Sequence, residues 1–330
     1  MNSFGRIFRI TIFGESHGES VGIVVDGCPA GLSLSINDFL PDLERRKGGT
    51  QKGTTPRKED DLPIFRSGIF NDRTTGAPIT ILFENKNTRS SDYERQRAIP
   101  RPGHADFVAH KKFGGYEDFR GSGHFSGRLT VALVAAGVIA KKLLGAVTVH
   151  SKICEIGGET DLEKGLQKAL DAKDTIGGII ECSVKGLAVG LGESFFDSAE
   201  SLLSHIVFAI PAIRGIEFGT GFAAAKMFGS NHNDAIEDLE GKTKTNHAGG
   251  IVGGLTNGNE LVFRVAVKPT SSTPQEQHTL NWETGKTETV SVKGRHDLCI
   301  ALRVPVVLEA VTAIVLADLL FLEQKIKRIF

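Results

Sequence analysis

Two apolar stretches limit the folds open to this chain. Residues 130–144 (TVALVAAGVIAKKLL) and 304–322 (VPVVLEAVTAIVLADLLFL) are long enough to form helices, and both are apolar nearly all round. A helix without a polar face has to be buried in a core or an interface. The second stretch also carries Glu309 and Asp318, and carboxylates are costly inside a lipid bilayer. We therefore predict two buried helices and no membrane span.

Around these helices the chain alternates between strand-like runs and polar loops. Strands are predicted at 6–13, 21–27, 62–70, 78–83, 147–156, 177–184, 215–218, 261–267 and 289–292, and shorter helices at 35–46, 161–174 and 198–209. The two halves are alike in outline, because each has strands, a polar loop, a Gly-His motif and a long apolar helix. No domain boundary is visible.

The composition excludes several classes of function. Lys plus Arg and Asp plus Glu both number 39, so no global field favours nucleic acid or an anionic membrane. The 20 Phe, two Tyr and one Trp argue against a stacking platform for single strands. The N-terminus lacks a signal-peptide layout, so a cytoplasmic protein is expected. Cys28, Cys154, Cys182 and Cys299 are far apart, which favours reduced thiols over disulfides or a zinc site.

Five short, Gly-flanked turns carry histidine. They are GESHG at 14–18, RPGHAD at 101–106, GSGHFSGR at 121–128, NHAGG at 246–250 and GRHD at 294–297. Seven of the ten histidines lie in or beside such turns, at 17, 104, 110, 124, 232, 247 and 296. A core does not require this distribution, whereas a site assembled from several loops does.

Long polar loops connect the predicted elements. We expect mobile loops at about 45–60, 85–103, 230–246 and 270–288, and the first two are rich in Arg and Lys. A loop this basic is either solvated or binds a polyanion, and the residues alone favour neither. The turn at 126–128 offers free backbone N–H groups and a guanidinium at the start of an apolar helix, which suits an anion.

Taken in order, these motifs resemble the chorismate synthase family. GESHG at 14–18, DGCP at 26–29, RPGHAD at 101–106, NHAGG at 246–250, KPTSS at 268–272 and RHD at 295–297 extend over nearly the whole chain. The resemblance implies an α+β fold, a β-α-β sandwich in which helices lie between two largely antiparallel sheets. It also implies a single large domain with internal pseudo-duplication, over residues 1–330, assembled as a homotetramer.

The activity that the resemblance implies is the anti-1,4-elimination of phosphate from 5-enolpyruvylshikimate-3-phosphate, which gives chorismate. The family requires reduced FMN without net redox change. No added reductase segment is visible, so we expect an external flavin reductase, with NADPH a candidate reductant. No metal site, nucleic acid or membrane is implied.

The family's functional positions map onto this chain one by one. The catalytic roles fall on His104 (departure of phosphate), His17 (protonation state of the flavin), Asp297 (base acting on flavin N5) and Ser16 (assisting). FMN-binding roles fall on His124, Phe125, Ser126, Pro211, Ala212, Gly253, Lys268, Pro269, Thr270, Ser271, Ser272 and Arg295. Substrate-binding roles fall on Arg46, Lys52, Arg101 and Arg128, with Arg295 also near the substrate.

The chain departs from the family pattern at three places. Many members have Arg-Ser-Ser-Ala-Arg where this chain has HFSGR at 124–128, and Asn-Ala where it has Pro211-Ala212. Lys52 stands in for an arginine, which keeps the charge and loses the planar fork. We expect the backbone groups that bind the flavin to be kept, while individual side-chain contacts to the flavin differ.

Two alternatives come from other classes of protein. A flavin- or NAD(P)H-dependent oxidoreductase is one, but no G-x-G-x-x-G motif opens a helix after a strand here. An anion- or RNA-binding module without catalysis is the other, and neutral net charge with few stacking aromatics weighs against it.

Overall fold

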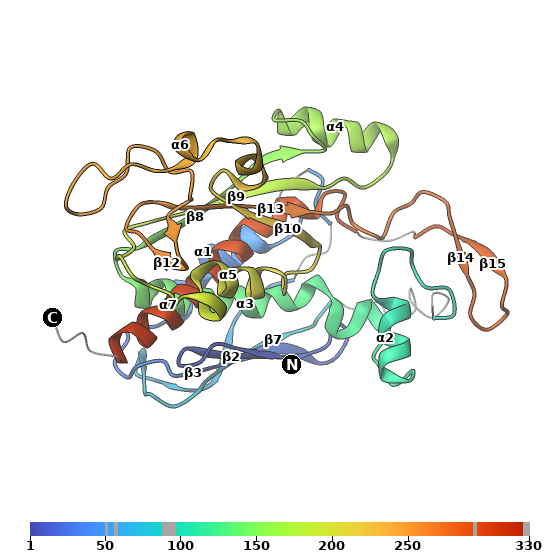
Figure 1. Ribbon diagram of the computed structural model, residues 1–330. Coiled ribbons are helices and arrows are strands. Elements are labelled where there is room, and N and C mark those ends of the chain that lie inside the picture. Colours follow the sequence, from blue (N-terminus) through green and yellow to red (C-terminus); the bar gives the residue numbers. More distant parts are fainter. Residues whose placement is uncertain (50–51, 56–58, 88–96, 293–295, 326–330) are drawn as a thin grey trace.

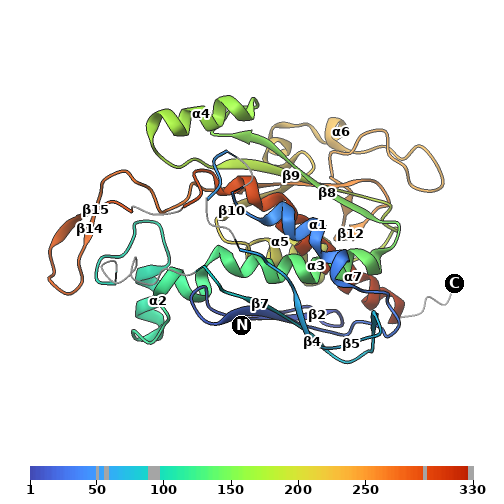
Figure 2. The same cartoon turned by 180° about the vertical axis from the view of Figure 1, so that it is seen from behind.

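The computed structural model describes residues 1–49, 52–55, 59–87, 97–292 and 296–325. Two antiparallel sheets enclose a layer of helices (Figures 1 and 2). The first sheet has the strand order β1 (Ser3–Phe4), β2 (Arg9–Gly14), β3 (Ser20–Asp26), β7 (Ile79–Glu84), β4 (Ile64–Ser67). The second has the order β10 (Ile213–Phe218), β13 (Leu261–Val267), β9 (Gly178–Lys185), β8 (Thr148–Ile156). The predicted sandwich is confirmed.

Four helices form the middle layer between the sheets. They are α1 (Ile36–Arg46), α3 (Thr130–Leu144), α5 (Ala199–Val207) and α7 (Val304–Lys325). The strands alternate as a half-buried sheet requires, and in β13 Leu261, Phe263 and Val265 are buried while the residues between them are partly exposed. The inward faces of both sheets and the helices thus share one apolar core.

The two halves of the chain repeat one topology. In the first half, strands β2, β3, β4 and β7 follow one another in sequence, and their order in the sheet is first, second, fourth, third. In the second half, β8, β9, β10 and β13 have the same order, again with every pair antiparallel. A helix lies between the second and third strands of each half, and a long apolar helix follows the fourth. The expected pseudo-duplication is therefore present in the topology.

The long helices α3 and α7 cross in the centre of the protein (Figure 1). A Cβ placed on Gly137 of α3 would lie 2.3 Å from the Cβ of Ala310 and 2.5 Å from its Cα. The helix at 300–324 is long and apolar enough to span a membrane by those criteria alone, but 83% of its most apolar window is buried inside the protein. Both stretches are core helices, as predicted.

The two carboxylates of α7 have protein partners. Glu309 binds both Nη atoms of Arg45, each at 2.7 Å, and also accepts hydrogen bonds from Lys141 Nζ and the Ser151 backbone. Asp318 accepts hydrogen bonds from three consecutive backbone N–H groups, at residues 6–8. A buried charge is tolerated when it is paired in this way. Both acids therefore tie α7 to neighbouring segments.

The remaining elements lie around the sandwich. They are β5 (Ile69–Phe70), β6 (Arg73–Thr74), α2 (Asp106–Phe113), α4 (Leu162–Ala172), α6 (Gly229–His232), β11 (Ile251–Val252), β12 (Leu255–Thr256), β14 (Gln277–Leu280) and β15 (Thr287–Val290). Helix α4 lies outside the second sheet, whereas α2 and the β14–β15 hairpin lie beyond one end of the helical layer (Figure 1). The expected loop at 270–288 therefore contains most of a hairpin.

Candidate active site

A cavity of about 680 Å³ opens at the end of the helical layer, where four of the five histidine turns contribute residues. The fifth turn, NHAGG at 246–250, does not line it. Its volume falls within the range of roughly 300–1,000 Å³ typical of small-molecule sites. Both halves of the chain contribute to its walls. Among the predicted site residues, those lining it are Ser16, Arg46, Arg101, His104, His124, Phe125, Ser126, Arg128, Pro211, Ala212, Lys268, Pro269, Thr270, Ser271, Ser272 and Asp297.

One wall of the cavity is built around a buried carboxylate, Asp61. Its Oδ2 accepts a hydrogen bond from Arg46 Nη1 at 3.1 Å, and its Oδ1 accepts one from Arg128 Nη1. Burial by itself raises the pKa of the Asp61 carboxyl, but the nearby Arg46 and Arg128 charges outweigh it and lower the pKa overall. Asp61 is therefore an ionised counterion to both arginines.

A second cluster surrounds His104. The ring Nδ1 lies 2.6 Å from Asp106 Oδ1, and Nε2 lies 3.2 Å from Ser122 Oγ. Arg101 binds both oxygens of Asp106 and also reaches Ser122. Burial raises the pKa of Asp106, but hydrogen bonds from Arg101 and His104 lower it below its ordinary value. An ionised Asp106 can accept a hydrogen bond from Nδ1–H, which directs Nε2 of the His104 ring towards Ser122.

Ser122 occupies an unusual backbone conformation. Its φ is +71°, in the left-handed region, and it lies between Gly121 and Gly123, which also have positive φ. A residue with a side chain is strained in this backbone conformation, and strained residues are common at functional sites. The turn brings the Ser122 hydroxyl against His104.

The Gly-Glu-Ser-His-Gly turn at 14–18 packs against the turn at 121–123. A Cβ on Gly121 would lie 2.3 Å from Cδ2 of His17 and 3.0 Å from Oγ of Ser16, so the close approach requires glycine. Asn85 donates to the carbonyls of Glu15 and Gly18 and accepts from Arg128 Nε. Asn85 therefore joins the histidine turn to the Asp61 cluster.

The stretch at 268–272 docks onto the His104 turn from the other half of the chain. Lys268 Nζ and Ser271 Oγ both donate to the carbonyl of Gly103, and Arg101 Nη1 donates to Ser272 Oγ at 3.0 Å. Burial lowers the pKa of Lys268, and nearby Arg214 adds to the effect. The hydroxyl of Thr270 is buried without a hydrogen-bond partner among the described residues. It is the polar atom here that a ligand would satisfy.

Asp297 is held from two sides. The backbone N–H of Thr55 donates to its Oδ1 at 2.8 Å, and Arg303 Nη1 donates to its Oδ2 at 3.1 Å. Arg303 Nε also donates to the carbonyl of Arg46. The carboxylate of Asp297 therefore has a fixed position on the cavity wall beside the Asp61 cluster.

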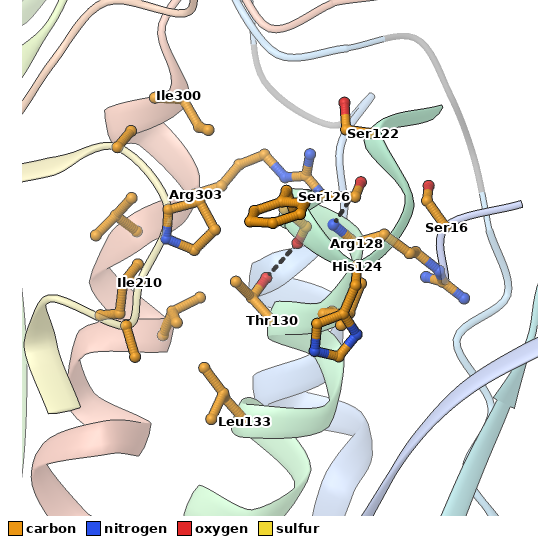
Figure 3. A pocket seen from close by; sticks show the side chains of 18 of the residues that line it. Ser16, Ser122, His124, Ser126, Arg128, Thr130, Leu133, Ile210, Ile300 and Arg303 are labelled. Carbon is orange, nitrogen blue, oxygen red and sulfur yellow. Dashed lines mark hydrogen bonds between the residues drawn. The ribbon is translucent and has the colours of Figure 1, made fainter. Parts of the chain in front are cut away.

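The cavity is cationic on one side and apolar on the other. Its lining in the described part of the chain includes six cations (Arg46, Lys47, Arg101, Arg128, Lys268, Arg303) and three carboxylates (Glu59, Asp61, Asp297), a formal excess of three positive charges with histidines neutral. Figure 3 shows Ile210, Ile300 and Leu133 on one side, with Ser16, Ser122 and Arg128 on the other. Such a cavity suits ligands that bring anionic groups to one side and an apolar group to the other.

Comparison with known proteins shows to which family the chain belongs. A family model described as chorismate synthase matches residues 8–321. The chain belongs to the chorismate synthase family. Chorismate synthase of Chitinophaga pinensis is 69% identical, covering 100% of this chain and 99% of the relative. That of Dehalococcoides mccartyi is 44% identical, covering 96% of each chain. A crystal structure of a chorismate synthase matches with a TM-score of 0.73 at 27% identity, covering 96% of this chain and 92% of the other.

Some chorismate synthase positions predicted from the sequence lie elsewhere. Gly253 lies in the turn between β11 and β12 and does not line this cavity. Lys52 also lies outside the lining, with Nζ 3.4 Å from Gln167 Oε1. His17 is buried behind Gly121 rather than on the cavity wall, although neighbouring Ser16 reaches the wall. Arg295 is outside the described residues.

In the two stretches that depart in part from the chorismate synthase pattern, 124–128 and 211–212, side-chain and backbone groups have local partners. His124 lies with Nδ1 2.8 Å from the carbonyl of Gly14, and so joins β2 to the cavity wall. Ser126 Oγ accepts a hydrogen bond from the backbone of Arg128 and begins the turn that leads into α3. Ala212 has φ of +75°, and its carbonyl accepts from the backbone of Lys268. The backbone therefore keeps these loops in place.

The sequence alone assigned no role to five residues of the site: Asp61, Asn85, Asp106, Ser122 and Arg303. Asp106 and Ser122 lie inside the motifs at 101–106 and 121–128, so these motifs were the available signal. Asp61 and Asn85 lie in polar stretches without a motif, and Arg303 immediately precedes the apolar stretch at 304–322. Only their contacts with residues far along the chain reveal them.

Proposed function

We propose that this chain eliminates phosphate from 5-enolpyruvylshikimate-3-phosphate to give chorismate, as a carbon–oxygen lyase. The observation that supports this most directly is the cavity, in which His104, Ser16 and Asp297 face an excess of positive charge. The substrate carries two carboxylates and one phosphate, so its charge complements the wall. Fixed cations around a departing phosphate stabilise the charge that develops on it.

We also propose reduced FMN as the cofactor, and the cavity residues fit it. The apolar side offers Ile210, Val304 and Val307 to a flat ring system. The Lys268–Ser272 stretch, with the unpartnered Thr270 hydroxyl, offers polar groups to its edge or phosphate. These residues would hold reduced FMN, which would supply electron-donating chemistry without net oxidation.

The contacts of His104 and of the turn that carries His17 favour a division of roles opposite to the one implied by the resemblance. His104 is bound to Asp106, and Arg101 joins Asp106 to Ser272, in the stretch proposed for the flavin. The His17 turn is bound through Asn85 to Arg128, on the side proposed for the substrate. We therefore propose that His104 controls the protonation of the flavin and that His17 with Ser16 serves the departing phosphate. The pH dependence of the spectrum of bound reduced FMN, compared between His104→Ala and His17→Ala, tests this exchange.

Asp297 is proposed as the base. Its two oxygens are held by the Thr55 backbone and by Arg303, which fixes the direction in which the carboxylate can accept a proton. Arg46, Arg101 and Arg128 bind and orient the anionic groups of the substrate. The apolar side excludes water from the reacting atoms.

An anaerobic assay tests the activity against the oxidoreductase alternative. We expect phosphate release from 5-enolpyruvylshikimate-3-phosphate when photoreduced FMN is present, and none with oxidised FMN. NAD(P)H should change nothing once the flavin is reduced, because an external reductase is proposed to supply the electrons. Consumption of NAD(P)H in step with product, by the purified chain alone, would contradict this proposal.

We further propose a homotetramer in the cytoplasm. Several phenylalanines of the second half are largely exposed in the single chain, namely Phe195, Phe196, Phe222 and Phe228. Large exposed apolar side chains are typical of protein–protein contacts when they lie close together. Sedimentation equilibrium should give four times the 35.4 kDa of the chain. A mass equal to one chain at micromolar concentration would contradict the assembly, and cell fractionation tests the location.

A further inference from the structure

Asp61 is the most enclosed carboxylate of the cavity wall. Its side chain is 2% exposed, and those of its two partners Arg46 and Arg128 are 3% and 6% exposed. Its φ is +50°, in the left-handed region that asparagine, aspartate and glycine tolerate best. The chain therefore adopts an uncommon conformation at the point where this carboxylate meets two guanidinium groups.

Several other N–H groups of the two arginines also bind the protein, and because a guanidinium has five such groups, each arginine keeps at least one for an anion. Arg46 donates to Thr130 Oγ1 and to the carbonyls of Gly127 and Arg128, all at the start of α3. Arg128 donates to Asn85 Oδ1 and to the carbonyl of Glu84 at the end of β7. Asp61 is the group that both arginines share. It therefore links the end of α1, where Arg46 lies, to the first sheet and to α3.

We propose that Asp61 is a positioning residue, which holds Arg46 and Arg128 at the spacing needed to orient the substrate. The inference rests on the proposed function, because it concerns how the anionic substrate is oriented. Two buried guanidinium groups repel each other without a counterion, and a buried charge left without its partner is strongly unfavourable. Without Asp61, a substrate carboxylate or phosphate would also have a second place to bind between the arginines.

This reasoning distinguishes positioning from simple neutralisation of charge. If Asp61 only reduced the positive charge of the cavity, its loss would strengthen binding of the anionic substrate. If Asp61 positions the arginines, its loss weakens productive binding although the cavity becomes more cationic. The two roles therefore predict changes of opposite sign in kcat/KM.

The test uses two variants that keep the backbone conformation. Asp61→Asn keeps the shape and removes the charge, whereas Asp61→Gly also opens the space of the carboxylate. We expect kcat/KM to fall at least tenfold in both.

Added formate should restore activity and raise the melting temperature of Asp61→Gly in a saturable way, because formate can occupy the open space between the arginines. It should do neither for Asp61→Asn, where the space is filled. Asp60→Asn, an exposed neighbour with the same change of charge, should behave as the wild type.

Each outcome decides the proposal. An unchanged or increased kcat/KM in Asp61→Asn would overturn it, as would an equal effect of formate on both variants. If the wild type itself releases no phosphate, the proposed function fails. The melting temperatures with and without formate then still decide whether Asp61 holds the two arginines. If Asp61→Asn does not fold, Asp61→Gly purified in formate supplies the same comparison after the formate is removed.

Discussion

We expect His104→Ala to lower the turnover of phosphate release by about 100- to 10,000-fold, the usual contribution of an acid–base group. The ring of His104 is fixed by Asp106 and Ser122 and reaches the cavity. The salt bridge between Arg101 and Asp106 does not depend on the ring, so the fold should remain. The measurement is anaerobic phosphate release with saturating reduced FMN, together with circular dichroism of the variant.

Two further variants provide the comparison. His17→Ala should also lower turnover strongly, because His17 is packed against Gly121 beside Ser16. His278→Ala should not, because His278 lies in β14, away from the cavity lining, with Nδ1 3.2 Å from Thr289 Oγ1. A His104→Ala protein that turns over at the wild-type rate would remove the acid–base role from this residue.

The second large effect concerns stability. We expect Gly137→Ala to lower the free energy of unfolding by about 1–3 kcal/mol, the usual cost of overpacking a core. The added methyl would lie 2.3 Å from the Cβ of Ala310 and 2.5 Å from its Cα, and backbone atoms of a buried helix cannot move aside. Alanine favours a helix over glycine by up to about 1 kcal/mol, so a net loss means that the clash outweighs propensity. Urea unfolding followed by circular dichroism measures the change.

Two controls locate the cause of that loss. Gly229→Ala meets no atom within 4 Å, so it should leave the unfolding midpoint unchanged. Adding Ala310→Gly to Gly137→Ala removes the closest contact and should recover part of the loss. A Gly137→Ala protein more stable than the wild type would show that α3 and α7 can separate without cost.

The apolar helices illustrate what local patterns predict well. The helix predicted at 130–144 has the same bounds as α3, and the one predicted at 304–322 continues only to Lys325 in α7. Their burial follows from composition, because no face of either helix is polar enough to meet water. The strand order of the two sheets did not follow from any pattern in the sequence. It depends on which edges pair across long stretches of chain.

The candidate site also has parts that the sequence predicted and parts that it did not. The histidine turns and the arginines were visible because each carries a local motif. The residues that orient these histidines and arginines could not be predicted from the sequence. Asp61 and Arg46 are 15 residues apart, whereas Arg303 meets the carbonyl of Arg46 across 257 residues. A single polar residue in a loop gives no sign of such a contact.

The amino-acid sequence by itself determined the core helices, the family and the kinds of side chain at the site, because these depend on composition and on short motifs. Only the tertiary structure decided that Asp61 lies between two arginines, that His17 is behind Gly121, and that Lys268 is bound to the His104 turn. The physical reason is distance: hydrogen bonds and ion pairs act over a few ångströms, and folding alone brings these distant residues within that range.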